Sequence, residues 1–325
     1  MVDSAPGSVR TSSSDSLRPL VRHPTLWFED GDIVLTTNVT LFRVHRATLA
    51  LHSPVFADML SMPQPEGVET PLDDLPVVEL SDKDAEFTHL LQYFYNRGYY
   101  HRGASTTFDK ISALLRMSTK FQMDDLRNDI IAHLATVYPA TIEKYMEAVD
   151  PEIQLSLFPP FDGQHFAVVA LARETDASIL LPTALWRSSC HEIFHICNGI
   201  PRPDGSLLKL SSRDMKYSLN AKNFCNTTYV QVESTLPLKL GDNCLRTRSK
   251  DKCTNRAMYS LLRHFCMRQR PLDYHDVLTQ WHGFDSWKHL LCDSCAESAN
   301  ATATSLRRNW WSFLPALYNL PGWAR

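Results

Sequence analysis

The sequence lacks a long uncharged segment and is poor in glycine, and each shortage excludes a class of protein. The longest run without Asp, Glu, Lys or Arg covers 309–324 and contains Pro315 and Pro321, so it is too short for the roughly 20 apolar residues of a membrane helix. None of the 11 glycines forms G-x-G-x-x-G or G-x-x-x-x-G-K, the loops that cradle nucleotide phosphates. We therefore expect neither a membrane span nor a nucleotide-binding loop.

Cysteine is too scarce for a disulfide scaffold, with eight residues in 325. The N-terminal residues are rich in Ser and include no apolar core of the length that a secretory signal needs. We expect an intracellular chain, cytoplasmic or nuclear, in which cysteines are thiols or metal ligands. The same composition predicts a disordered leader over residues 1–25.

Charge is distributed unevenly between the two halves of the chain. Residues 1–150 carry 13 Lys and Arg against 21 Asp and Glu, whereas residues 151–325 carry 20 against 15. This asymmetry favours two structural units with different surfaces.

Strand patterns come first in the chain, and helical patterns follow. The β-type runs 32–35 and 41–45 predict a hairpin, and 76–80 predicts a third strand. Residues 46–59 have helical spacing, with a break at Ser53-Pro54 into two short helices. Ser81 and Asp84 resemble a capping box at the start of a helix that continues to about residue 95.

The rest of the chain reads as helical. Apolar spacing predicts helices over 109–120, 124–137 and from 141, then over 164–187, 212–220, 255–268, 273–291 and 300–314. Pro182 is expected to break the helix that contains it, and the last helix is expected to end before Pro315. Strands followed by helices indicate an α+β fold, then an α-helical region.

The first half contains an ordered set of motifs. These are an Asp before a β-run, an aromatic strand that ends in His-Arg, and Ser-x-x-Phe before a Met-Leu pair, as in GDIVL at 31–35, FRVHRATLA at 42–50 and SPVFADML at 53–60. The segment resembles a BTB/POZ domain, which we place at 26–138. The resemblance implies a compact α+β module that pairs with proteins and performs no chemistry. It also implies structural roles for the motif residues Asp32, His45, Ser53 and Phe56.

The whole chain is similar to a fungal subgroup of stand-alone BTB proteins, in which a helical region follows the BTB domain. The matching C-terminal feature is a Trp-rich Leu-Pro motif, WWSFLP at 310–315 and LPGW at 320–323. We therefore expect an N-terminal α+β BTB/POZ domain, followed over 139–325 by a mostly α-helical domain.

His191, Glu192 and His195 satisfy H-E-x-x-H, a pattern that places two imidazoles on one helix face for zinc and a Glu beside a bound water. The extended metalloprotease pattern fails, because Asn198 and Pro201 occupy its Gly and third His positions. A chance match at a helix end is the favoured interpretation, with a metalloprotease as the alternative.

Cys292 and Cys295 form a C-x-x-C pair, which is half of a zinc site, a redox pair or two unrelated thiols. The fungal subgroup tends to have an upstream cysteine pair as well, and Cys244 and Cys253 match its placement. Four thiolates would complete a structural zinc site that staples a loop of the C-terminal region. The alternative is four ordinary thiols.

Residues 246–270 contain eight Lys or Arg and one acid, Asp251. Such a stretch can neutralise phosphates, but a solvated helix face is the favoured interpretation because no groove-reading motif accompanies it. Our functional hypothesis is a non-enzymatic protein-interaction module that self-associates, or acts as a scaffold or adaptor, through its BTB domain. A nucleic-acid binder that uses 246–270 is the alternative. A cullin-type ligase partner follows from family analogy alone.

Overall fold

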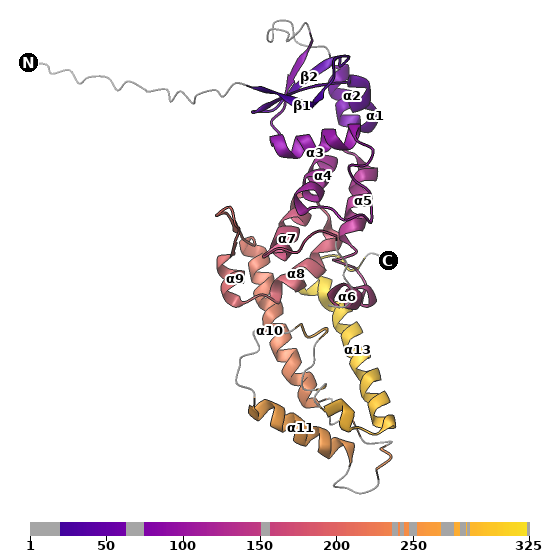
Figure 1. Cartoon of the computed structure of the whole chain (residues 1–325). Coiled ribbons are helices and arrows are strands. Elements are labelled where there is room, and N and C mark those ends of the chain that lie inside the picture. The colour runs from indigo at the N-terminus through magenta and orange to yellow at the C-terminus, as the bar shows by residue number, and fades with distance from the viewer. Residues whose placement is uncertain are drawn as a thin grey trace, which may run out of the picture. The chain divides into compact units, whose positions relative to one another are not determined.

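The computed structural model describes residues 20–62, 75–150, 157–235, 240, 244–246, 252–267, 276–279, 284 and 287–323. The chain divides into two compact units, and Figure 1 gives the element labels used below. Unit 1 comprises Met1–Tyr99 with Phe121–Met123, and unit 2 comprises Tyr100–Lys120 with Asp124–Arg325. The domain boundaries expected from the sequence, 26–138 and 139–325, remain a prediction.

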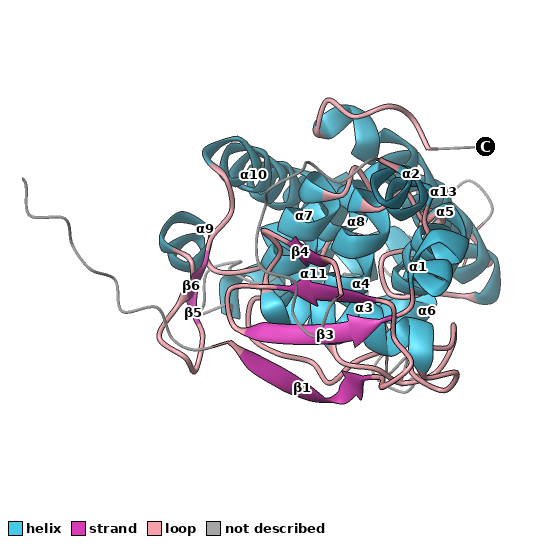
Figure 2. Ribbon diagram, turned by 90° about the horizontal axis from the view of Figure 1, so that it is seen from above, coloured by secondary structure: helices cyan, strands magenta, loops and turns pink. Residues whose placement is uncertain are grey.

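Unit 1 contains a four-stranded sheet with the order β1-β3-β2-β4, and Figure 2 shows its strands from above. Its strands are β1 Val21–Trp27, β2 Ile33–Thr36, β3 Thr40–Val44 and β4 Val77–Glu79. Strands β2 and β3 are antiparallel with Ile33 opposite Val44, and β1 and β4 pair in parallel with β3 and β2. The expected hairpin and third strand are thus confirmed.

Strand β1 corrects the expected leader. Residues 21–25 form part of a strand and therefore do not belong to a disordered segment; residues 1–19 lie outside the described residues. Pro24 falls where the pairing between β1 and β3 shifts register, as expected for proline on an edge strand. Residues 21–27 form a strand because they pair with β3, and not because they contain an apolar run of their own.

Three helices complete unit 1, namely α1 Arg46–His52, α2 Pro54–Ser61 and α3 Asp84–Tyr95. The break between the first two is confirmed, because the Ser53 hydroxyl accepts a hydrogen bond from the backbone N–H of Phe56 and so caps α2. The expected capping box of α3 is wrong. Its N-cap is Lys83, without a side-chain bond, while Asp84 accepts a hydrogen bond from the Thr37 hydroxyl.

Unit 2 is mostly helical in its described residues. Its elements are α4 Phe108–Lys120, α5 Asp124–Leu134, α6 Ile142–Val149, α7 Gln164–Glu174, η1 Ser178–Leu180, α8 Leu181–Ser189, α9 Ile193–Asn198, β5 Ile200–Pro201, β6 Leu207–Leu208, α10 Ser212–Thr235, α11 Cys253–Met267, η4 Lys288–Leu290 and α13 Asp293–Leu317. The helical C-terminal region expected from the sequence is therefore confirmed.

Helices α7 and α8 pack side by side, and eight of the nine residues of α8 are buried. Seven of the 11 residues of α7 are buried, and they point to more than one side of the helix. A helix that is apolar on all sides lies in a core. The core of unit 2 is therefore built around the packed pair α7 and α8.

Two predicted helix limits in unit 2 need correction. The segment 164–187 breaks after α7, where Asp176 adopts a left-handed φ of 51°, and Pro182 lies instead in the first turn of α8, a position that suits proline. Helix α10 is longer than the expected 212–220. The expected helix 273–291 falls largely outside the described residues.

Helix α13 continues past Pro315 to Leu317, so the predicted end before this proline is wrong. Proline removes the N–H that would pair with the carbonyl four residues earlier, which here belongs to Trp311. That carbonyl accepts a hydrogen bond from the indole N–H of Trp323 instead. The helix therefore loses a backbone bond without leaving its acceptor unpaired.

Candidate functional site

The motif residues of the first half lie where the strands meet the helices. The carboxylate of Asp32 accepts a hydrogen bond of 2.7 Å from the backbone N–H of Arg46, the first residue of α1. The backbone N–H of His45 donates to the Tyr95 hydroxyl at 3.0 Å. These contacts tie the hairpin to α1 and α3, and they are compatible with the structural roles that remain predicted for Asp32 and His45.

Ser53 and Phe56 form the second part of this junction. The buried Ser53 hydroxyl donates a 2.7 Å hydrogen bond to the carbonyl of Phe121. The Phe56 ring stacks on the ring of Phe121, with centroids 4.3 Å apart and planes 11° apart. Residues 53–56 therefore join α2 to the short segment of unit 1 at 121–123.

The H-E-x-x-H residues do not share a helix face. Helix α9 begins at Ile193, so His191 and Glu192 precede it and lack the helical spacing to His195 that the motif requires. The His191 ring lies against Phe166, with centroids 5.1 Å apart. Among the described residues, four cysteines form the group whose side chains converge in the way that metal ligands do.

Cys244, Cys253, Cys292 and Cys295 come together as the sequence suggested. Their four Sγ atoms all lie within 4.8 Å of one another, and Cys244 and Cys292 are 4.0 Å apart. Cys253 is the first residue of α11, while Cys292 is the N-cap of α13 and Cys295 lies in its first turn. The cluster therefore joins the N-termini of two helices.

The surroundings of the cluster favour thiolates on two of its members. Backbone hydrogen bonds, the strongest from Cys253, lower the pKa of Cys244, and the bond from Cys295 lowers the pKa of Cys292 to about 6. Burial raises the pKa of the Cys253 and Cys295 thiols. Positive helix ends and N–H donors stabilise the negative sulfurs that bind metal.

The spacing of the four sulfurs fits a tetrahedral zinc ion. Zn–S bonds of about 2.3 Å place sulfur atoms roughly 3.8 Å apart, close to the 4.0 Å between Cys244 and Cys292. A disulfide needs about 2.05 Å between its sulfurs, and all four residues are free thiols. These residues can hold zinc with little rearrangement.

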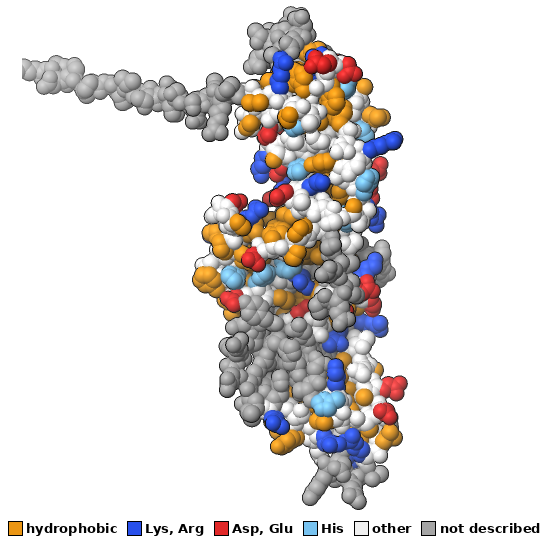
Figure 3. Space-filling view, viewed as in Figure 1, with side chains coloured by type: hydrophobic (Ala, Val, Ile, Leu, Met, Phe, Trp, Pro, Cys, Tyr) orange, Lys and Arg blue, Asp and Glu red, His pale blue; other side chains and the backbone are white. Residues whose placement is uncertain are grey.

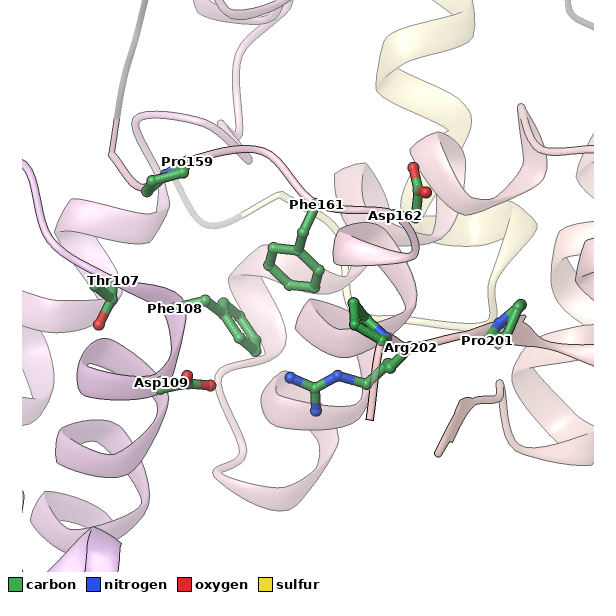
Figure 4. Close-up of a pocket in the computed structure, with 9 residues that line it drawn as sticks. Thr107, Phe108, Asp109, Pro159, Phe161, Asp162, Pro201 and Arg202 are labelled. Carbon is green, nitrogen blue, oxygen red and sulfur yellow. The ribbon is translucent and has the colours of Figure 1, made fainter. Parts of the chain in front are cut away.

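A cavity of about 570 Å³ that the sequence did not indicate lies elsewhere in unit 2. Figure 4 shows Phe108 and Phe161 facing a common space beside the guanidinium of Arg202, and the two ring centroids are 5.1 Å apart. Its lining comes from the start of α4, the segment before α7 and the turn after β5. Such distant segments leave no local motif from which the cavity can be recognised.

The basic stretch 246–270 is described in part. Arg246, Lys252, Arg256 and Arg263 are placed, and its other four basic residues lie outside the described residues. Arg256 and Arg263 are exposed on α11 with Tyr259, whose exposure is 73%. The helix face is thus solvated, with one aromatic ring between two cations.

None of the helices in the described part of the chain combines the length and hydropathy of a membrane span.

No curated protein matches the chain. Residues 28–137 match the family model described as BTB/POZ domain. The strand and helix junction built on Asp32, His45 and Ser53 falls within this match. The N-terminal part of the chain is therefore a BTB/POZ domain, a protein-interaction module, followed by a mostly helical region.

Proposed function

We propose that the protein is a non-enzymatic scaffold or adaptor that self-associates through its BTB/POZ domain and presents its helical region to a further protein. The match of residues 28–137 to the BTB/POZ family supports this proposal most directly. Self-association would double the number of helical regions in one particle and so raise avidity for a repeated partner. A cullin-type ligase as that partner remains a prediction by analogy.

An exposed apolar group on unit 1 is the proposed contact surface. Val21 of β1 is 61% exposed, and Leu20 and Val39 are also exposed. The backbone N–H of Val21 donates to the carbonyl of Val39 at 3.0 Å, so the start of the edge strand β1 lies beside the turn between β2 and β3. An apolar group at a sheet edge is a common element of protein interfaces.

Sedimentation velocity of the full chain at increasing concentration tests self-association. We expect a dimer for the natural sequence, and a monomer when Val21→Lys and Val39→Lys are combined. Leu262→Lys, which changes an exposed leucine of α11, is the matched control and should remain dimeric. A natural protein that stays monomeric throughout contradicts self-association, and a dimeric double variant contradicts the surface.

We also propose that the four cysteines bind one structural zinc ion. Bound zinc would hold the N-termini of α11 and α13 together. It would thereby fix the shape of the surface that the helical region presents. The sulfur spacing and the N–H donors around Cys244 and Cys292 support this role.

Metal content of protein purified without chelator tests the zinc proposal. Elemental analysis should find about one zinc ion per chain, and Cys292→Ser or Cys295→Ser should lose it. Cys197→Ser is the control, because Cys197 is exposed and outside the cluster. The same zinc content in all of these proteins would contradict ligation by the cluster.

The alternative function is nucleic-acid binding through 246–270. The arrangement of Arg256, Tyr259 and Arg263 on the exposed side of α11 favours it, since cations with an interposed ring can contact phosphate and stack on a base. Binding of a DNA duplex and a single strand should then weaken steeply with salt and be lost in Arg256→Gln with Arg263→Gln. Binding that is absent, or unchanged in that variant, removes this alternative.

A further inference from the structure

A second cavity in unit 2, of about 350 Å³, is lined by charged and titratable side chains that the proposed function does not use. Its lining comes from α6, α7, α8, the turn after α8 and the segment 276–279. Among the described residues it includes Val149, His165, Arg187, Cys190, His191, Asp276 and Thr279. On the face drawn in Figure 3, histidine side chains lie among hydrophobic ones at the level of α8 and α9. The volume suits a small molecule rather than a peptide.

Arg187 supplies the permanent charge of this cavity. Its side chain is largely enclosed, and within the described part of the chain its guanidinium makes no hydrogen bond or ion pair. Asp276 attracts the guanidinium electrostatically, but enclosed N–H donors that have no acceptor are unfavourable. A forked guanidinium at a cavity wall is therefore suited to an oxyanion that supplies two acceptor atoms.

Asp276 is not that partner, because its carboxylate is already engaged. One oxygen accepts hydrogen bonds from the Trp186 indole at 2.9 Å and from the backbone N–H of Leu278 at 3.0 Å. The other accepts a 2.6 Å bond from the Tyr145 hydroxyl. Three donors hold this carboxylate against the wall, where it attracts Arg187 electrostatically without accepting a hydrogen bond from it.

His191 provides a second unsatisfied group at the same cavity. Its Nε2 atom is buried and has no hydrogen-bond partner among the described residues. The His191 carbonyl accepts a bond from the buried Lys222 ammonium at 2.9 Å, which adds positive charge nearby. A buried polar atom in a native structure is normally paired, so His191 also indicates a missing polar ligand.

His165 completes the polar wall. Its Nδ1 atom lies 2.9 Å from the Tyr138 hydroxyl, and its ring centroid is 5.6 Å from that of His191. Burial lowers the pKa of both imidazoles, most strongly that of His165. Both rings are therefore neutral at pH 7, and they can donate or accept a hydrogen bond without adding a second full charge beside Arg187.

We propose that this cavity binds a small molecule through an oxyanion group, a carboxylate or a phosphate, held by the Arg187 fork and by His191. The site is distinct from the cysteine cluster and from the BTB/POZ domain. A bound oxyanion would join Arg187 of α8 to His191 in the turn that follows this helix. Ligand binding would thus order the end of α8 and the turn after it.

Calorimetric titration of the full chain with inorganic phosphate and with citrate, at constant ionic strength, tests the site. We expect saturable binding that is about tenfold or more weaker in Arg187→Lys, which keeps the charge but loses the fork. Arg308→Lys is the control, because Arg308 is exposed and pairs with Glu143 at the surface. A preference for phosphate or for citrate distinguishes the two oxyanion classes.

Histidine-ring NMR of the natural protein gives a readout that does not depend on any variant. The His165 and His191 signals should move on titration, whereas exposed His289 should not. Three results would each overturn the proposal: no saturable binding of either anion, equal binding by Arg187→Lys, or unmoved His191 signals on saturation. None of these outcomes bears on self-association, so the two proposals fail separately.

Discussion

The indole rings of Trp311 and Trp323 stack with centroids 5.1 Å apart and planes 5° apart, while the Trp323 N–H donates to the Trp311 carbonyl at 2.9 Å. The Trp311 indole in turn donates to the carbonyl of Ala140 at 3.0 Å and packs against Tyr145 of α6. The C-terminal Trp motif therefore clamps α13 to α6. It also replaces the bond that Pro315 removes from the helix.

This relationship predicts a coupling between Trp323 and Pro315. Trp323→Phe retains a ring but loses the donor, and should lower the free energy of unfolding by about 1 kcal/mol. In a Pro315→Ala background the new N–H can pair with the Trp311 carbonyl, so the same change should have a smaller effect. Urea unfolding of the four proteins gives the coupling energy. Equal effects in both backgrounds would show that the Trp323 bond does not compensate for the proline.

Metal removal should destabilise the helical region. If zinc binds only the folded cluster, excess metal at about a hundredfold over its Kd adds about 2.7 kcal/mol. A chelator should therefore lower the Tm of the natural protein and reduce its helix signal in circular dichroism. Cys295→Ser, which should already lack the ion, serves as the reference and should not respond. A natural protein with an unchanged Tm would argue against a structural role for the metal.

Stability should fall as the pH decreases below about 6.5, because His165 is held neutral in the fold. Burial lowers its pKa well below the ordinary 6.5, and Arg187 and His191 face the same ring and lower it further. The unfolded chain then binds a proton that the folded chain does not, at up to about 1.4 kcal/mol per pH unit. The stabilisation that comes from the neutral His165 ring is fully present above the pKa of this residue in the unfolded chain. It is lost progressively as the pH falls from that value toward the lower pKa in the folded protein.

Urea unfolding between about pH 7.5 and about pH 5.5 measures this effect. His165→Gln removes the titrating ring, and its stability should decrease less steeply over the same range. His289→Gln, at an exposed position, should follow the natural protein. Parallel curves for His165→Gln and the natural protein would show that His165 is not the group involved.

Ser53→Ala should destabilise the BTB/POZ domain by about 2 kcal/mol, since it removes a helix cap and leaves the Phe121 carbonyl without its donor. Ser61→Ala is the matched control, because the Ser61 hydroxyl is exposed and bonds within its own turn. That change should stay within about 0.5 kcal/mol. Thermal unfolding of both variants compares the two positions.

Local patterns predicted the elements that carry their own signal. In the hairpin, apolar residues follow one another in Ile33–Thr36 and alternate with other residues in Thr40–Val44. Ser53-Pro54 is a strong signal for the start of a helix. Strand β1 escaped prediction because its stability comes from pairing with β3. The end of α13 was misjudged for a similar reason, since a donor at Trp323 makes Pro315 acceptable inside a helix.

The cysteine cluster and the Arg187 cavity also differ in whether a local sequence pattern indicates them. Cys292 and Cys295 form a recognisable pair, and Cys244 with Cys253 could be added by family resemblance, so the cluster was foreseen. The Arg187 cavity was not, because its walls come from segments that the chain brings together only when it folds. No spacing rule connects Arg187 to Asp276 in the sequence.

The burial of α7 has a consequence for the order in which the helical region opens. Its amides lie among side chains such as Phe166 and Val168 that are almost wholly enclosed, so they can exchange with solvent only when α8 separates from it. Amides of α11, whose Tyr259 and Leu262 are exposed, can exchange through smaller openings. Deuterium should therefore enter α11 well before α7, and the slowest amides of α7 should report the global opening of this unit.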